Sequence, residues 1–84
     1  MNKLEDKNEY WTVTFNDQDF SGLEIISKEF DGCSFKGCNF SEALFKRCNF
    51  VDCEFVNCNL SNVELGYSKF SEVAFYESKL VGID

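Results

Sequence analysis

A large apolar residue stands at every fifth position of this chain, without a break, from Phe15 to Leu80. The run is Phe15, Phe20, Ile25, Phe30, Phe35, Phe40, Phe45, Phe50, Phe55, Leu60, Leu65, Phe70, Phe75 and Leu80, and it includes all 10 phenylalanines. A helix would spread positions five apart around its circumference, and a straight strand would send alternate members to opposite faces. The pattern therefore requires a backbone that bends once in every five residues and returns the same position to the interior, as a coil with flat sides does.

The residue two positions before each of these centres is mostly small and apolar. This second set is Val13, Gln18, Leu23, Lys28, Cys33, Cys38, Ala43, Cys48, Cys53, Cys58, Val63, Ser68, Val73 and Ser78. A spacing of two places such a residue on the same side of a short extended segment as the centre. The other positions of each unit are rich in Asn, Ser, Asp, Glu, Lys and Gly, which suit corners and solvent.

The units at 33–37, 38–42, 48–52 and 58–62 read CSFKG, CNFSE, CNFVD and CNLSN. They resemble the repeats of the pentapeptide-repeat proteins, in which a small residue is followed by Asn or Asp, then by Leu or Phe, then by two variable residues. The resemblance covers residues 13–84. It implies an all-β fold, a right-handed quadrilateral β-helix of about 3.5 coils and roughly 17 Å length, with four units to a coil. Qnr-like proteins that interact with gyrase are distant relatives within that family.

Four units to a coil would stack residues 20 apart, so the apolar centres form four inward columns with offset aromatic rings. The predicted columns are Phe15/Phe35/Phe55/Phe75, Phe20/Phe40/Leu60/Leu80, Ile25/Phe45/Leu65 and Phe30/Phe50/Phe70. On the outside, Asn39 is expected to stack on Asn59. Lys28 at the small inward position would bury an unpaired charge, so we expect either a distorted corner around 27–29 or an outward-turned Lys28. A small β-sandwich, the alternative fold, needs strands of uneven length with turns about every 8–12 residues, which the unbroken period opposes.

The 5 cysteines, which complete the predicted core, invite a metal or disulfide interpretation. They are Cys33, Cys38, Cys48, Cys53 and Cys58, all at the small inward position. Zinc ligands usually come in pairs two to four residues apart together with His, and this chain has no His. Parallel side chains in stacked coils hold their sulfurs apart, and a reducing compartment keeps them free. We therefore predict buried free thiols that act as small apolar side chains, with no metal and no cofactor.

The chain carries 8 basic and 15 acidic residues, for a net charge of −7. Phosphate binding needs a basic surface, so a free nucleic acid is not an expected ligand, whereas a basic protein surface remains open. Solubility is the simplest role of such a charge. No stretch approaches the roughly 20 apolar residues of a membrane helix, and residues 1–10 have no apolar signal region. We expect a cytoplasmic protein with no membrane partner.

Acidic pairs such as Asp52/Glu72 and Glu24/Glu64 fall on outward columns, where a coil filled with Phe offers no cleft for acid–base chemistry. The sequence has neither a Ser/His/Asp arrangement nor a Gly-x-x-x-x-Gly-Lys phosphate loop. We therefore predict no catalytic residues and no enzymatic activity.

The two ends of the chain are expected to differ. Residues 1–12 break the repeat and are predicted to form an N-terminal cap, helical or extended, in which Leu4, Tyr10 and Trp11 cover the first coil of a β-helix at 13–84. The last coil would expose a predicted dimer end made of Phe70, Phe75, Leu80 and Ile83. Two explanations are open. Either two chains stack end to end as a homodimer, a known habit of the family that the chain resembles, or the chain is a fragment of a longer β-helix.

The sequence thus favours a non-enzymatic structural or protein-interaction module of unassigned biological role, as a homodimer through the C-terminal coil. A flat face around Val51, Val56 and Tyr76 would meet a protein partner. The resemblance implies an alternative, because some pentapeptide-repeat proteins bind DNA gyrase or topoisomerase IV through an acidic rod that resembles duplex DNA. The chain would then be a DNA mimic that modulates quinolone sensitivity. Against this, the chain is short beside the members that protect gyrase, and it has no loop inserted into the repeats.

Overall fold

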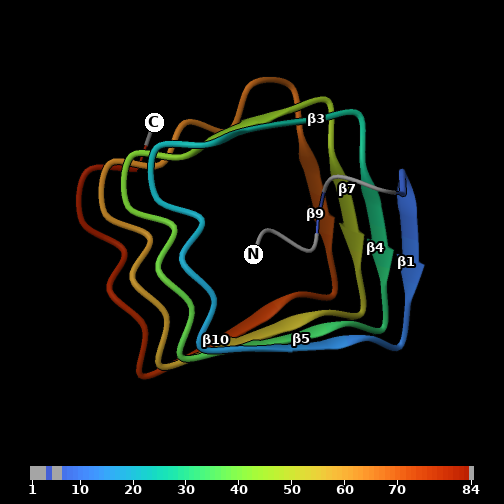
Figure 1. Cartoon of the computed structure of the whole chain (residues 1–84), viewed down its shortest axis with the longest axis horizontal. Helices are drawn as coiled ribbons and strands as arrows, with labels where there is room; N and C mark the ends of the chain where they lie inside the picture. The colour runs from blue at the N-terminus through green and yellow to red at the C-terminus, as the bar shows by residue number, and fades with distance from the viewer. Residues whose placement is uncertain (1–3, 5–6, 84) are drawn as a thin grey trace.

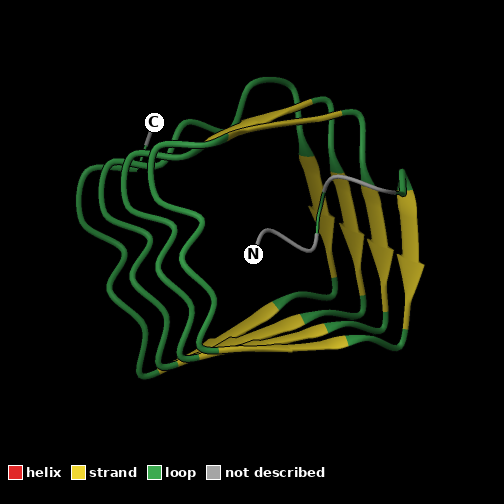
Figure 2. Ribbon diagram, in the orientation of Figure 1, coloured by secondary structure: helices red, strands yellow, loops and turns green. Residues whose placement is uncertain are grey.

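The computed structural model describes Leu4 and residues 7–83, and this part of the chain consists of short strands joined by turns and bends (Figure 2). The strands are β1 (Glu9–Trp11), β2 (Thr14–Asn16), β3 (Glu24–Ile26), β4 (Glu29–Asp31), β5 (Ser34–Lys36), β6 (Leu44–Lys46), β7 (Asn49–Val51), β8 (Glu54–Val56), β9 (Lys69–Ser71) and β10 (Ala74–Tyr76). They wind around one axis as a coil with four sides (Figure 1). The predicted right-handed quadrilateral β-helix is therefore confirmed. Among the described residues, no helix long and apolar enough to cross a membrane occurs.

Three sides of the coil are parallel β-sheets. The strand order is β1-β4-β7-β9 on one side, β10-β8-β5-β2 on the next, and β3-β6 on a third (Figure 1). The register pairs each centre with the centre one coil later, as in Phe15 with Phe35 and Phe30 with Phe50. The predicted stacking of residues 20 apart is confirmed, because every strand pair of the structure follows it.

The fourth side carries only isolated bridges, which join Asp19 to Asn39, Asn39 to Asn59 and Asn59 to Lys79. Its local cause is a repeated Asp/Asn-x-Ser sequence. The Oδ1 atoms of Asp19, Asn39 and Asn59 accept the backbone N–H groups of Ser21, Ser41 and Ser61 at 3.0, 2.9 and 3.0 Å. Such a turn uses an amide that a strand would offer to its neighbour. This side therefore zigzags where the others extend, although Asn39 and Asn59 stack as predicted.

Each corner is formed by a residue with positive φ, two positions after a centre. Non-glycine examples are Ser27 at 56°, Asp52 at 54° and Glu42 at 61°, and Gly22 and Gly37 serve the same purpose at 68° and 66°. This left-handed conformation is costly for most L-residues and is tolerated best by Gly, Asn and Asp. The bend that the five-residue period predicts is thus made by one residue of left-handed conformation in each unit of the coil.

One corner departs from this pattern. Glu64 meets Leu44 only as an isolated bridge, and Gly66 and Tyr67 both have positive φ, at 28° and 61°. A Cβ atom on Gly66 would lie 2.7 Å from the carbonyl oxygen of Phe45, so the turn requires glycine. The backbone arches outward here, at the top of Figure 1, and leaves Tyr67 90% exposed.

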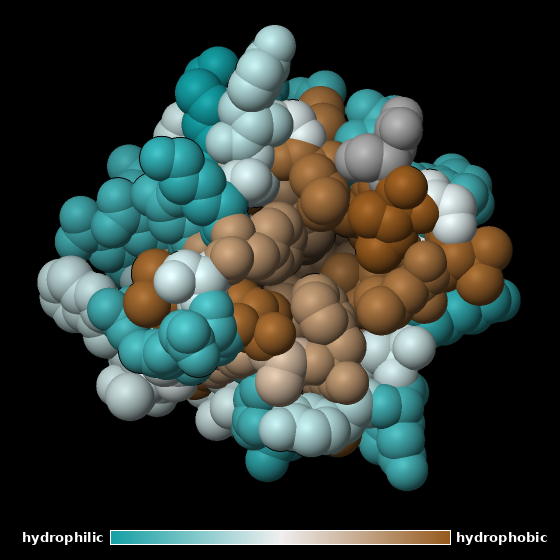
Figure 3. All heavy atoms as spheres, turned by 180° about the vertical axis from the view of Figure 1, so that it is seen from behind, coloured by the Kyte–Doolittle hydropathy of each residue, from teal (hydrophilic) through white to brown (hydrophobic). Residues whose placement is uncertain are grey.

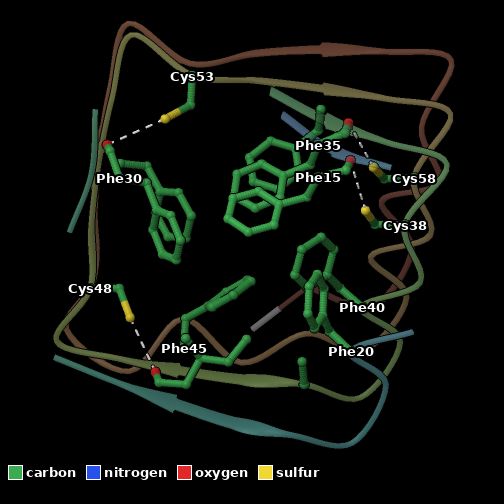
Figure 4. Close-up of a cluster of buried hydrophobic side chains, with 14 of the residues drawn as sticks. Phe15, Phe20, Phe30, Phe35, Cys38, Phe40, Phe45, Cys48, Cys53 and Cys58 are labelled. Atoms are coloured by element: carbon green, nitrogen blue, oxygen red, sulfur yellow. Dashed lines mark hydrogen bonds between the residues drawn. The ribbon is translucent and has the colours of Figure 1, made fainter. Parts of the chain in front are cut away.

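The core is a set of stacked aromatic columns. Phe15, Phe35, Phe55 and Phe75 stack with ring centroids 5.0, 4.7 and 5.1 Å apart. Neighbouring columns meet edge to face, as Phe30 and Phe35 do at 5.4 Å and 71° (Figure 4). Both arrangements are the ones that ring quadrupoles favour. Each coil therefore supplies packing partners for the coils before and after it, and the solenoid is stabilised by these interactions between neighbours.

The coil begins one unit earlier than the sequence predicted. Strand β1 pairs with β4 and places Tyr10 opposite Phe30, with the rings stacked at 5.3 Å. The predicted boundary between a cap at 1–12 and a β-helix at 13–84 is therefore wrong for residues 9–12. The sequence pattern does not reveal this unit, because Asn8 stands at the small position and Tyr10 at the centre.

Lys28 avoids full burial by reaching toward the N-terminal end of the coil. Its ammonium group donates hydrogen bonds to the carbonyl oxygen of Lys7 at 2.6 Å and to Oδ1 of Asn8 at 3.3 Å. The adjacent corner is regular, because the φ of Ser27 is 56°, within the range of the other corners. Of the two predicted alternatives, the distorted corner is not observed, and Lys28 is half-buried with its ammonium group bonded at the N-terminal end of the coil.

Candidate functional site

The predicted core residues differ in burial according to their distance from the last coil. The centres from Phe15 to Leu60 and all five cysteines are buried. Leu65 and Phe70 are partly buried. Phe75 and Leu80, which were predicted both as core centres and as part of the exposed end of the last coil, are 39% and 42% exposed, so only the second assignment agrees with the structure. The reason is that no further coil covers them within the described residues.

The small inward position carries hydrogen-bond donors as well as small side chains. Each cysteine Sγ–H donates to the carbonyl oxygen of a centre residue 23 positions earlier, on the preceding coil, and Figure 4 shows this for Cys38, Cys48, Cys53 and Cys58. The pairs are Cys33 with Tyr10 at 3.4 Å, Cys38 with Phe15 at 3.4 Å, Cys48 with Ile25 at 3.1 Å, Cys53 with Phe30 at 3.3 Å and Cys58 with Phe35 at 3.2 Å. The cysteines therefore act as hydrogen-bond donors as well as the small apolar side chains that the sequence predicted.

Serine replaces cysteine at this position without loss of the hydrogen bond. The hydroxyls of Ser68 and Ser78 donate to the carbonyl oxygens of Phe45 and Phe55 at 3.1 and 3.2 Å. A thiol and a hydroxyl share only a donated proton and a small volume. The position thus selects a small donor, and sulfur chemistry is not what it requires.

At two small inward positions, Ala43 and Val63, the side chain has no hydrogen-bond donor, and the centre carbonyl of the preceding coil is bonded within its own turn. The carbonyl oxygen of Phe20 accepts the N–H of Leu23 at 3.3 Å, and that of Phe40 accepts the N–H of Ala43 at 3.0 Å. The residues 23 positions after Phe20 and Phe40 are Ala43 and Val63, which have no polar side-chain atom. Where a centre carbonyl already accepts a backbone N–H of its own turn, the next coil therefore needs no side-chain donor for it. Val73, 23 positions after Phe50, is the exception.

Four of the five cysteines are poorly suited to chemistry because their pKa is raised, whereas the hydrogen bond with Cys38 lowers the pKa of Cys58 to about 7. Desolvation raises the pKa of the Cys33 and Cys48 thiols, and it raises the pKa of Cys53 to about 11. The neighbouring Cys58 sulfur, followed by desolvation, raises the pKa of Cys38. The thiolate is the form that attacks or binds metal. In the part of the chain that the structure describes, no group of three or more His, Cys, Asp or Glu is placed to hold a metal ion.

The C-terminal end of the coil is an open apolar surface (Figure 3). A hollow of about 210 Å³ is lined by Leu60, Leu65, Phe70, Phe75, Leu80 and Ile83. We call these residues the C-terminal hollow. Phe75, Leu80 and Ile83 are 39%, 42% and 38% exposed, and a contiguous apolar patch of this kind marks an interaction surface. The structure thus brings all the predicted dimer-end residues together at one surface.

At the opposite end, the residues predicted to form a cap lie in different environments. Leu4 is 3% exposed and joins the core cluster, and Tyr10 is 5% exposed in the first coil. Trp11 is 65% exposed, so the prediction that it covers the first coil is wrong. Side chains alternate along a strand. Once Tyr10 points inward, its neighbour Trp11 must point outward.

The predicted flat apolar face is divided between two sides of the coil. Tyr76 lies opposite Val56 on paired strands β10 and β8, and it is 53% exposed. Val51, which is 37% exposed, lies on β7 of the adjacent sheet. Tyr76 and Val56 can therefore contact a partner together, but Val51 faces another direction.

Charge is unevenly distributed over the sheets. The strands of the β1-β4-β7-β9 sheet present Glu9, Trp11, Glu29, Asp31, Asn49, Val51, Lys69 and Ser71 outward, which we call the acidic face. Its carboxylates all lie on β1 and β4. On the β10-β8-β5-β2 sheet, Lys36 offsets Glu54, and Glu54 also accepts a hydrogen bond from Ser34 Oγ at 2.9 Å. The β1–β4 half of this sheet thus carries three carboxylates, Glu9, Glu29 and Asp31, and no basic strand residue.

Known proteins share this architecture. The sequence model of a pentapeptide repeat region matches residues 28–84. A structure of trypsin-treated QnrB1, a plasmid-mediated fluoroquinolone resistance protein, is similar with a TM-score of 0.83 and 27% identity, over 99% of this chain and 41% of that one. A second structure of trypsin-treated QnrB1 has a TM-score of 0.55 and 17% identity, over 90% of this chain and 49% of that one, a likeness of fold alone. The chain spans less than half the length of either. No curated protein matches it.

Proposed function

Because the chain belongs to the pentapeptide-repeat family, we propose that it is a non-enzymatic protein-interaction module that works as an end-to-end homodimer. The pentapeptide-repeat fold is that of a known non-enzymatic family. The observation that carries the proposal is the C-terminal hollow, where apolar centres of the last coil stand open to solvent. The wider biological role of the module stays unassigned.

A twofold axis through the hollow would make its surface self-complementary. Each copy offers the same ring of apolar side chains and the same open edges of β9 and β10. An uncovered strand edge carries backbone groups ready to pair with another chain. Two copies placed end to end would cover both edges, remove Phe75 and Leu80 from water, and continue the aromatic columns from one copy into the other.

A pair of adjacent substitutions tests this dimer. Leu80 is 42% exposed at the hollow, whereas Val81 is 64% exposed on the outer surface beside it. We expect Leu80→Glu to give a monomer in sedimentation equilibrium, because it places charge in an apolar interface. The matched Val81→Glu variant keeps the wild-type mass. A Leu80→Glu protein that stays dimeric would rule out the hollow as the interface.

The module is proposed to meet a protein partner through the side that carries Val56 and Tyr76, and to act in the cytoplasm. Exposed aromatic residues on a flat surface are common anchors at interfaces. The buried cysteines are all free, as expected in a reducing compartment. A Tyr76→Ala variant that retains every partner of the wild-type protein in a cross-linking experiment would refute the role of this side.

The second candidate function is an acidic DNA mimic that binds DNA gyrase or topoisomerase IV and modulates quinolone sensitivity. Its support is the likeness to QnrB1 together with the net charge of −7. An acidic rod can occupy a basic groove that normally holds duplex DNA. Purified gyrase with a fluoroquinolone is the test, and we expect a concentration-dependent change in supercoiling. No change at a large molar excess of the protein would remove this candidate.

A further inference from the structure

Trp11 is held in an exposed position by the register of the first coil. The ring of Tyr10 stacks on Phe30 at 5.3 Å and is 5% exposed, which fixes the inward face of β1. Turning Trp11 inward would require a one-residue slip that sends Tyr10 into water. The indole therefore stays outward, 65% exposed, directly opposite Asp31 on the paired strand β4.

The carboxylates around this indole have no cation beside them on the sheet. Glu9 lies opposite Glu29 in the register of β1 and β4. Strand spacing puts such partners about 4.8 Å apart at the backbone, where like charges repel. Among the described residues of the sheet, the one cation is Lys69 on β9, which the register places beyond Asn49 and therefore two strands from Glu29.

The basic residue nearest in sequence is engaged elsewhere. Lys28 precedes Glu29, but its ammonium group donates to the carbonyl oxygen of Lys7 and to Asn8. The corner that follows β7 adds further negative charge through Asp52. Trp11 thus lies among carboxylates that form no ion pair with any described residue, although Lys7 lines the same hollow as Glu9 and Trp11.

We propose that the β1–β4 half of the acidic face binds a basic segment of a protein partner, with an arginine side chain stacked on Trp11. A guanidinium group lies flat on an indole by cation–π attraction, and its N–H groups can donate to two carboxylates at once. Asp31 lies opposite Trp11, and Glu9 and Glu29 extend the same surface. Arginine and tryptophan are also the residues that most often dominate binding energy at protein interfaces.

Charge decides between classes of partner. A nucleic acid or an anionic membrane would bring further negative charge to Glu9, Glu29 and Asp31, so neither fits this surface. A lysine would share the charge attraction but could not stack its point charge as a planar group does. The inference rests on the proposal that the chain is a protein-binding module, but it does not depend on the dimer or on gyrase.

Trp11 is the only tryptophan of the chain, so its fluorescence reports on this surface alone. The probe is a short peptide of alternating arginine and glycine, titrated into the full chain at physiological salt. We expect saturable quenching, and weaker binding of the lysine–glycine counterpart. The double variant Glu29→Gln/Asp31→Asn should weaken binding by at least about fivefold, since it removes two charge-assisted hydrogen bonds.

A matched control separates this surface from general attraction. Glu24→Gln/Glu42→Gln removes the same two charges from other sides of the coil, and we expect it to change the affinity by less than about twofold, as for distant screened charges. Equal weakening by both double variants would overturn the proposal, and so would an absence of saturable quenching. Dimer mass and gyrase activity are measured separately, so failure of the proposed function is distinguishable from failure of this inference.

Discussion

Substitution of Cys48 distinguishes a hydrogen-bond donor from a small apolar filler. Cys48 is fully buried, and its Sγ–H donates to the carbonyl oxygen of Ile25 at 3.1 Å. Serine at the equivalent position of the next coil, Ser68, makes the same bond at 3.1 Å. We therefore predict that Cys48→Ser is more stable than Cys48→Ala. A merely apolar site predicts the reverse order, because it would leave the serine hydroxyl unpaired.

The expected sizes follow from the interactions that each substitution removes. Cys48→Ala removes a neutral hydrogen bond worth about 1 kcal/mol and leaves a small cavity that costs roughly another 0.5–1 kcal/mol. The total is a reduction of about 1.5–2 kcal/mol in the free energy of unfolding, on the same grounds. Cys48→Ser keeps the donor and shrinks the side chain slightly, so we expect a reduction of less than about 1 kcal/mol.

Urea denaturation followed by circular dichroism measures both values, provided that the slope m stays constant among the variants. Ala43→Ser is the matched control, because Ala43 is fully buried but the carbonyl of Phe20 is already used by Leu23. A hydroxyl there would share a carbonyl that already accepts the Leu23 N–H, so we expect Ala43→Ser to cost about 1 kcal/mol. The reasoning is refuted if Cys48→Ala proves more stable than Cys48→Ser, or if Ala43→Ser is neutral.

The aromatic columns, the Gly66 turn and the buried thiols each give a further prediction. Phe35→Ala removes a fully buried ring stacked between two others and should cost about 3–5 kcal/mol in urea, whereas Phe75→Ala at the open end should cost about 1–2 kcal/mol. Gly66→Ala brings a Cβ to 2.7 Å from a backbone oxygen and should lower stability by about 2 kcal/mol or more; an unchanged melting temperature would contradict this. The folded-state pKa of Cys53 is raised from 9.0 to about 11, so its contribution is complete below pH 9 and is lost as pH rises through 11, which alkaline melting curves should show as falling stability.

The five-residue period of large apolar side chains predicted the architecture, because few backbone shapes can bury all of these side chains together. Large residues such as Phe35 and Phe50 can all reach one interior only on a coil that turns after each unit, and the stacked register then follows from four units per coil. The unit at Tyr10 does not stand out in the sequence because its flanking residues are atypical. The outward direction of Trp11 could have been predicted once that unit was assigned.

Other features depend on information that a hydrophobic pattern does not carry. The period says that Cys48 points inward, but the acceptor of its proton lies 23 positions away and depends on the turn type of another coil. The Asp-x-Ser turn at Asp19 could have been predicted from the sequence, since a carboxylate two residues before a serine often forms such a turn. The exposure of Phe75 and Leu80, in contrast, agrees with the expectation that the last coil leaves its centres open.

The mass of the protein in solution tests the central claim, an interaction module that pairs through its C-terminal hollow. Light scattering over a wide concentration range gives this mass without a shape assumption. A homodimer closed by the contact of two copies predicts a constant value of twice the 9.7 kDa chain mass. A value of 9.7 kDa at every concentration would contradict it.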